Sequence, residues 1–161
     1  MVGDPEGKAT PEKISGVMRE SEEKLEQATR ASANAMADAM ALTREALETR
    51  RTYCHPLSLL RYHAESACFQ LAMQLGEAPT ARACCRNVLA FYEMALSHVP
   101  WHPMISLERF QLAELEMKLG DCRTAHALLG KAANALVVTH GDGHIFVQRC
   151  DNQLQALSEV S

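Results

Sequence analysis

The sequence predicts an all-α fold in which antiparallel helical hairpins stack as an array, with a long N-terminal helical segment and a terminal capping helix. Hydrophobic residues make up 47% of the 161 residues, but aromatic residues make up only 5%. An alanine-rich chain with few aromatic residues favours close-packed helices over a sheet. From residue 54 onwards, helix start and stop signals also recur at a nearly regular interval, as expected for stacked hairpins.

Residues 1–10 are predicted to be a disordered lead-in. Thr10, Pro11 and Glu12 then provide an N-cap, a proline in the first helical turn and an acidic first turn. Strong helix formers fill residues 11–53, which predicts one long helix or a helix pair broken near residues 32–34.

A heptad-like stripe of mostly small residues runs along this N-terminal segment. Small side chains would let a facing helix approach closely. We expect the stripe to pack against the rest of the chain; the alternative is a self-association seam that forms a homo-oligomer through residues 14–53. Its members are Met18, Ser21, Leu25, Ala28, Ser32, Ala35, Ala39, Leu42, Ala46, Thr49 and Tyr53.

Residues 54–161 are predicted to contain two helical hairpins, about 57–97 and about 103–139, and a capping helix, about 145–158. A His-Pro pair opens each hairpin, and a Leu-Gly pair ends its first helix, where glycine suits a C-terminal cap. The His-Pro pairs begin at positions 55 and 102, which are 47 apart, and the Leu-Gly pairs begin at 75 and 119, which are 44 apart. A period in the forties with two helices per unit indicates a helical repeat array.

The most specific motif is the turn at residues 138–144, Val-Thr-His-Gly-Asp-Gly-His, before the last predicted helix. Together with residues 118–122 and 128–132, it resembles the end of the SET-and-MYND (SMYD) protein-lysine methyltransferases, whose tetratricopeptide-like repeats close with a similar turn. Met73-Gln74-Leu75-Gly76, Phe91-Tyr92 and Pro100-Trp101-His102-Pro103 are similar to an earlier repeat of that family, so the resemblance covers roughly residues 55–157 and, more loosely, 11–54. Ile145 departs from it, because the family usually has proline there. Kinesin-light-chain-type repeats share the His-Pro starts and the period.

The methyltransferase resemblance implies a non-catalytic C-terminal domain that restricts substrate access and recruits partners, including chaperone tails. The catalytic tyrosine and Asn-His pair of a SET domain, and the zinc-spaced cysteines of SET and MYND modules, are not found in the sequence. S-adenosylmethionine and zinc are therefore expected only in a missing catalytic part, and the parent protein would be the methyltransferase. The alternative is a free-standing tetratricopeptide or kinesin-light-chain-like adaptor that binds peptide segments or self-associates.

No catalytic, cofactor-binding or metal-binding residue is predicted in this chain. None of the six cysteines forms a CxxC pair, and most are expected to be small core hydrophobes. Glycines between His140 and His144 predict a structural turn rather than a helical metal pair. Cys122 and His126 could meet in space, but no glycine-rich loop offers an oxyanion pocket.

Basic and amide side chains of the repeat region are the predicted peptide-binding residues. Charge-assisted bonds to carboxylates are strong and directional, so the expected ligand is an acidic segment of a partner, or the parent's catalytic domain in cis. The alternative is that these side chains are solvated charges on the outer face. The candidates are Arg61, Arg82, Arg86, Asn87, Lys118, Lys131 and Asn134.

The charge and hydropathy of the chain limit its partners further. A net charge of −4 does not favour nucleic-acid binding. No apolar run approaches the ~18 residues of a membrane span, and the N-terminus has no signal-peptide core. We therefore expect a cytoplasmic protein, with the nucleus as a second compartment.

Overall fold

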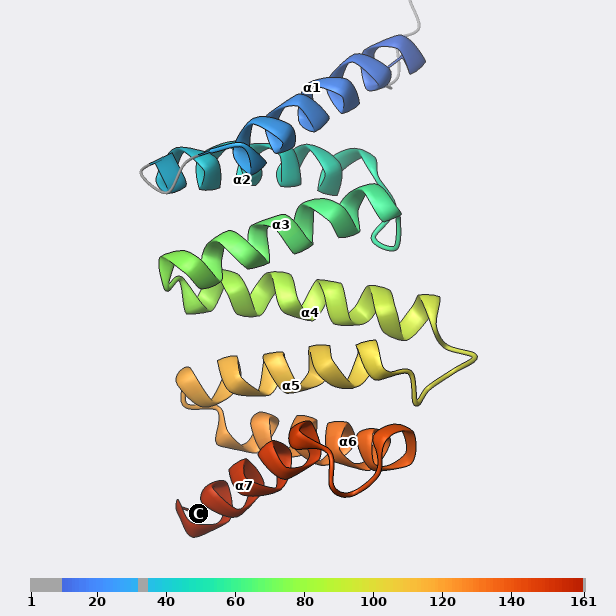
Figure 1. Cartoon of the computed structure of the whole chain (residues 1–161). Helices are drawn as coiled ribbons and strands as arrows, with labels where there is room; N and C mark the ends of the chain where they lie inside the picture. Colours follow the sequence, from blue (N-terminus) through green and yellow to red (C-terminus); the bar gives the residue numbers. More distant parts are fainter. Residues whose placement is uncertain (1–9, 32–34, 161) are drawn as a thin grey trace, which may run out of the picture.

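A computed structural model describes residues 10–31 and 35–160, and the described chain consists of seven helices without a strand. In Figure 1 the helices lie one above another from α1 to α7, and each packs mainly on the helix before and after it in the chain. This arrangement confirms the all-α, stacked-hairpin fold class. The helices are α1 (Pro11–Thr29), α2 (Met36–Tyr53), α3 (Leu59–Leu75), α4 (Ala78–Ala95), α5 (Pro103–Lys118), α6 (Cys122–His140) and α7 (Ile145–Val160).

The N-terminal segment is a helix pair, because α1 ends at Thr29 and α2 begins at Met36. The predicted break near 32–34 and all of the predicted lead-in except Thr10 lie outside the described residues. Thr10 is the N-cap of α1, and its hydroxyl accepts a hydrogen bond from the backbone N–H of Lys13 at 3.3 Å. This bond satisfies one of the N–H groups that have no partner within the helix.

The small-residue stripe packs α1 against α2. Its members Ser21, Leu25 and Ala28 on α1 and Ala39 and Ala46 on α2 are all buried. Small side chains at these positions allow the two helix backbones to approach closely, as the heptad-like spacing predicts. In this structure the stripe is therefore an intramolecular packing face.

The core consists of two adjoining clusters of small and medium side chains. One cluster contains residues of α1, α2, α3, α4 and α5, and the other contains residues of α5, α6 and α7. Cys68, Cys84, Cys85 and Cys150 are buried in these clusters, whereas Cys122 is exposed. Burial raises the pKa of the Cys150 thiol to about 11, so this thiol remains protonated and apolar at neutral pH.

Each histidine that opens a repeat accepts a hydrogen bond from the backbone N–H two residues later, but only His102 and His144 directly precede a helix. The Nδ1 atom of His55 accepts the backbone N–H of Leu57 at 3.2 Å, and Nδ1 of His102 accepts that of Met104 at 3.2 Å. His144 repeats the contact before α7, where its Nδ1 accepts the N–H of Phe146 at 3.3 Å. At α5 and α7 the imidazole thus supplies an acceptor for an N–H group that the helix cannot satisfy. His55 makes the same contact within the turn before α3, whose N-cap is Ser58.

His102→Ala is expected to lower the free energy of unfolding by about 1 kcal/mol, because the Met104 N–H loses its side-chain acceptor. His102→Asn is the matched control, since asparagine is a favourable N-cap and can accept the same bond. Urea denaturation followed by circular dichroism measures both variants. An asparagine variant as unstable as the alanine variant would show that His102 acts through packing and not through its cap.

Candidate functional site

A continuous hollow lies between α1 and α3, beside the start of α2. We call it the α1–α3 groove. Its main pocket has a volume of about 400 Å³ and is formed by ten residues, none of which is charged. A second pocket of about 400 Å³ continues it and shares Thr29 and Ala67 with the first. The groove thus follows α1 and α3 over several turns.

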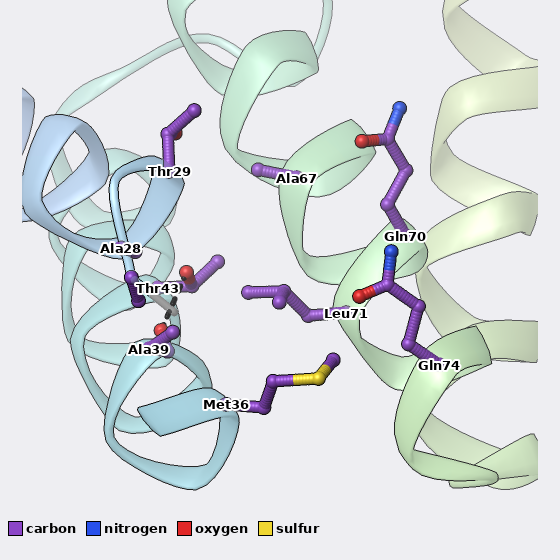
Figure 2. A pocket seen from close by; sticks show the side chains of 10 residues that line it. Ala28, Thr29, Met36, Ala39, Thr43, Ala67, Gln70, Leu71 and Gln74 are labelled. Atoms are coloured by element: carbon purple, nitrogen blue, oxygen red, sulfur yellow. Dashed lines mark hydrogen bonds between the residues drawn. The ribbon is translucent and has the colours of Figure 1, made fainter. Parts of the chain in front are cut away.

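Small side chains form the floor of the α1–α3 groove. Figure 2 shows Ala28, Ala39 and Thr43 on one side of the pocket and Ala67 on the other. The Thr43 hydroxyl donates to the Ala39 carbonyl at 2.8 Å, so its polar atom is already satisfied within α2. A floor of this kind presents little side-chain bulk to an incoming chain.

Two apolar and two amide side chains complete the main pocket. Leu71 on α3 and Met36 on α2 extend into the space between the helices, whereas Gln70 and Gln74 lie along the α3 side (Figure 2). Gln70 and Gln74 are exposed and one helical turn apart. Each amide can donate and accept hydrogen bonds, which is what an unpaired peptide backbone requires.

The charged end of the groove lies in the second pocket. Glu22, Glu26, Arg30 and His63 contribute to it. Arg30 pairs with Glu26 at 3.2 Å, and Glu22 pairs with the buried Arg50. These charges are therefore largely compensated within the chain, and the middle of the groove is neutral.

Two of the predicted peptide-binding residues, Arg61 and Asn87, pair with the buried carboxylate of Glu65. Asn87 donates from Nδ2 to Glu65 Oε1 at 3.0 Å, and Arg61 lies 3.5 Å from the same oxygen. Arg51 completes the arrangement with a bidentate pair, in which Nε and Nη2 each donate to a separate oxygen of Glu65 at 3.1 Å. Side chains from α2, α3 and α4 thus converge on one carboxylate.

Two further candidates, Arg82 and Arg86 on α4, pair with the buried Glu116 of α5. Arg86 donates to Glu116 Oε1 at 2.5 Å, and Arg82 Nη1 lies 3.5 Å from Oε2. The Glu116 side chain is fully buried, whereas half of the Arg86 side chain is exposed. The structure therefore uses these arginines to join α4 to α5.

Lys118, Lys131 and Asn134 are the predicted binding residues without an internal partner among the described residues, and all three are exposed. Lys118 lines a pocket between α3, α5 and α7. Lys131 and Asn134 lie on α6 and line none of the pockets between odd-numbered helices. The seven candidates are consequently not brought together at one site.

Sequence reasoning did not identify the α1–α3 groove. Gln70 and Gln74 are spaced four apart, but this spacing also fits an ordinary solvated face of a helix. The groove is recognisable only when the end of α1 and the start of α2 are placed beside α3. No local sequence pattern specifies that placement.

The described residues offer little for catalysis or metal binding. No three His, Cys, Asp or Glu side chains among them gather as a metal site requires. In this part of the chain no hydrogen bond joins the Cys122 thiol to the His126 ring, although both line a pocket of about 590 Å³. Of the helices that the structure describes, none has the length and apolar character needed to cross a bilayer.

These features define a helical repeat array with an open groove. No protein-family model matches the chain, and no curated protein matches it in sequence. The chain is similar in structure to a putative kinesin light chain from Podosopora anserina with nearly identical tetratricopeptide-like repeats. The TM-score is 0.61 at 13% identity, over 94% of this chain and 68% of that one.

A variant of the same protein gives a TM-score of 0.61 at 14% identity over the same shares. BtubC (BKLC) from P. vanneervenii gives 0.60 at 18% identity, over 96% of this chain and 67% of that one. At these identities the similarity shows the fold alone, which is a tetratricopeptide-like helical repeat. It supports the kinesin-light-chain-type resemblance and gives no specific support to the methyltransferase resemblance.

Proposed function

We propose that this chain is a non-catalytic tetratricopeptide-like adaptor whose α1–α3 groove binds a peptide segment of another protein. The observation that carries the proposal is the composition of the groove, which has a small-residue floor, an uncharged middle and two adjacent amides. Repeat folds of this type present extended surfaces on which partner chains bind.

The lining of the groove indicates how the peptide would be held. Ala28, Ala39 and Ala67 allow its backbone to come close to α1, α2 and α3, respectively. Gln70 and Gln74 would then exchange hydrogen bonds with that backbone. Met36 and Leu71 would contact its apolar side chains, and the flexible thioether of Met36 adapts to different shapes. Recognition in the groove thus depends on the main chain and apolar side chains more than on charge.

The regulatory role implied by the SMYD resemblance is a second proposal, which rests on residues 138–144, the end of α6 and the turn before α7. Here the rings of His140 and His144 lie 4.5 Å apart, and the Thr139 hydroxyl lies 2.7 Å from His140 Nδ1. The coding sequence upstream of Met1 tests this role. An encoded SET domain would support it, and the lack of one would leave the adaptor.

Ala67→Phe is expected to block peptide binding, because the ring would fill the junction of the two groove pockets. Peptides are first selected from a displayed library for binding to the unmodified chain. These peptides are expected to bind the variant at least about tenfold more weakly than the unmodified chain, a loss of about 1.4 kcal/mol in binding free energy. Ala90→Phe is the matched control, since Ala90 is exposed on α4. Fluorescence anisotropy measures both affinities, and circular dichroism verifies the fold. Equal binding by both variants, or failure to select any peptide, would contradict the proposal.

A further inference from the structure

Three turns lie along one side of the helical array, and we call this side the apolar edge. The turns are residues 54–58 between α2 and α3, 96–102 between α4 and α5, and 141–144 between α6 and α7 (Figure 1). Of the twelve exposed large apolar side chains among the described residues, ten lie in these turns or within four residues of them. They include Leu59 and Leu60 at the first turn, Met94 and Trp101 at the second, and Val138 and Ile145 at the third.

The three turns of the apolar edge carry almost no permanent charge. Asp142 is the only Asp, Glu, Lys or Arg in residues 54–58, 96–102 and 141–144. The turns on the opposite side of the array differ, since Arg30, Glu77 and Asp121 lie in the described parts of them. The buried centres of protein interfaces are poor in charged residues and rich in Trp, Tyr and Met. The composition of the apolar edge therefore indicates a protein contact.

The order of the three turns fits a second copy of the same chain. A two-fold interface pairs a surface with itself, so that surface must be self-complementary. With the axis at the α4–α5 turn, the middle turns of the two copies face each other. The α2–α3 turn of each copy then faces the α6–α7 turn of the other. Each of these pairings brings apolar side chains together, and none brings two permanent charges of the same sign together.

Asp142 gains a partner in the same arrangement. It is exposed in the α6–α7 turn and would face His55, which is exposed in the α2–α3 turn of the second copy. The Nδ1 atom of His55 accepts the backbone N–H of Leu57 at 3.2 Å, so the neutral ring carries its proton on Nε2. That N–H can donate a charge-assisted hydrogen bond to the Asp142 carboxylate. The single permanent charge of the turns is thereby compensated.

We propose that the apolar edge forms a homodimer, in which two copies pair antiparallel about an axis beside Trp101. The ten apolar side chains expose on the order of 1,000 Å² per copy, comparable to the ~800 Å² that each partner buries in a standard stable interface. Trp101 lies in the middle turn with 51% of its surface exposed. A tryptophan near the centre of an interface is the residue type that most often dominates its binding energy.

This inference goes beyond the proposed function and does not depend on it. The α1–α3 groove is lined by the first half of α2 and the second half of α3, whereas the apolar edge contains the last residue of α2 and the first residues of α3. Dimerisation at the apolar edge thus leaves both grooves open. The dimer would present two peptide-binding grooves to a partner with repeated segments.

Sedimentation equilibrium of the full chain over a range of concentrations tests the inference. The unmodified chain is expected to reach twice the 17.8 kDa of one chain, with a dissociation constant below about 10 µM. Trp101→Glu places two like charges beside the axis and is expected to raise the dissociation constant at least about a hundredfold. Met73→Glu is the matched control, because Met73 is an exposed apolar side chain outside the apolar edge. Circular dichroism verifies the fold of both variants.

Two outcomes of this experiment would overturn the inference. One is an unmodified chain that stays monomeric up to about 0.5 mM, a concentration at which a dimer of the expected affinity would be nearly complete. The other is equal dimerisation by Trp101→Glu and Met73→Glu, which would place the contact elsewhere on the chain.

A charge exchange tests the antiparallel pairing of the turns. His55→Asp is expected to weaken the dimer about tenfold, because it sets two carboxylates against each other. The introduced carboxylate can still accept the Leu57 N–H, so the turn keeps its cap. Addition of Asp142→Lys restores opposite charges and is expected to return the dissociation constant to within about threefold of that of the unmodified chain. If the double variant stays as weak as His55→Asp, the two turns do not meet and the inference fails.

Discussion

Replacing Glu65 by alanine is expected to lower the free energy of unfolding by about 3–5 kcal/mol, the range seen when one partner of a buried ion pair is removed. Glu65 is only 1% exposed. Both of its oxygens receive charge-assisted hydrogen bonds from Arg51, and Asn87 adds a third bond. The alanine variant would leave these donors without their acceptor at the junction of α2, α3 and α4. Guanidinium chloride denaturation measures the loss.

Glu48→Ala is the matched control for this experiment. Glu48 also pairs with Arg51, at 2.8 Å, but 70% of its side chain is exposed. Exposed pairs typically contribute no more than about 1 kcal/mol, because water competes for both charges. If Glu65→Ala were no more costly than Glu48→Ala, the buried carboxylate would not stabilise the array in the way that its contacts indicate.

The position of Glu65 shows why the sequence alone does not distinguish a peptide-binding side chain from one that pairs inside the fold. An arginine or asparagine in an amphipathic helix has the same sequence pattern whether it is solvated, binds a ligand or pairs inside the fold. The partners are distant in sequence, since Asn87 pairs with Glu65 and Arg86 pairs with Glu116 on another helix. Only the packing of α3, α4 and α5 brings these pairs together, and no helical period encodes that packing.

The predictable part of the fold depended on local signals. Proline at helix starts and glycine after Leu75 and Leu119 act within one helical turn, so their effect is independent of tertiary packing. Gly76 has a φ of +73° and Gly120 of +82°, the left-handed conformation that glycine adopts without steric cost. The grooves, in contrast, are formed by residues from two or three helices, and their composition becomes meaningful only after those helices are assembled.

Arg50→Met is expected to lower stability by about 2–4 kcal/mol, with the loss concentrated in α1. The Arg50 side chain is fully buried and joins three helices. It donates to Ser21 of α1 at 3.2 Å and to the Leu60 carbonyl of α3 at 2.7 Å, and it pairs with Glu22. Methionine retains much of the apolar volume but none of the donors, so the Leu60 carbonyl loses this partner.

The effect should be local because each helix of a repeat array contacts mainly its neighbours. Hydrogen exchange followed by mass spectrometry is expected to show faster exchange in α1, with α5, α6 and α7 unchanged. Arg30→Met is the control, since Arg30 is 79% exposed and its ion pair with Glu26 is on the surface. Because α1 forms one wall of the α1–α3 groove, Arg50→Met should also weaken peptide binding there. Uniform loss of protection in all seven helices would instead indicate that the array unfolds as one cooperative unit.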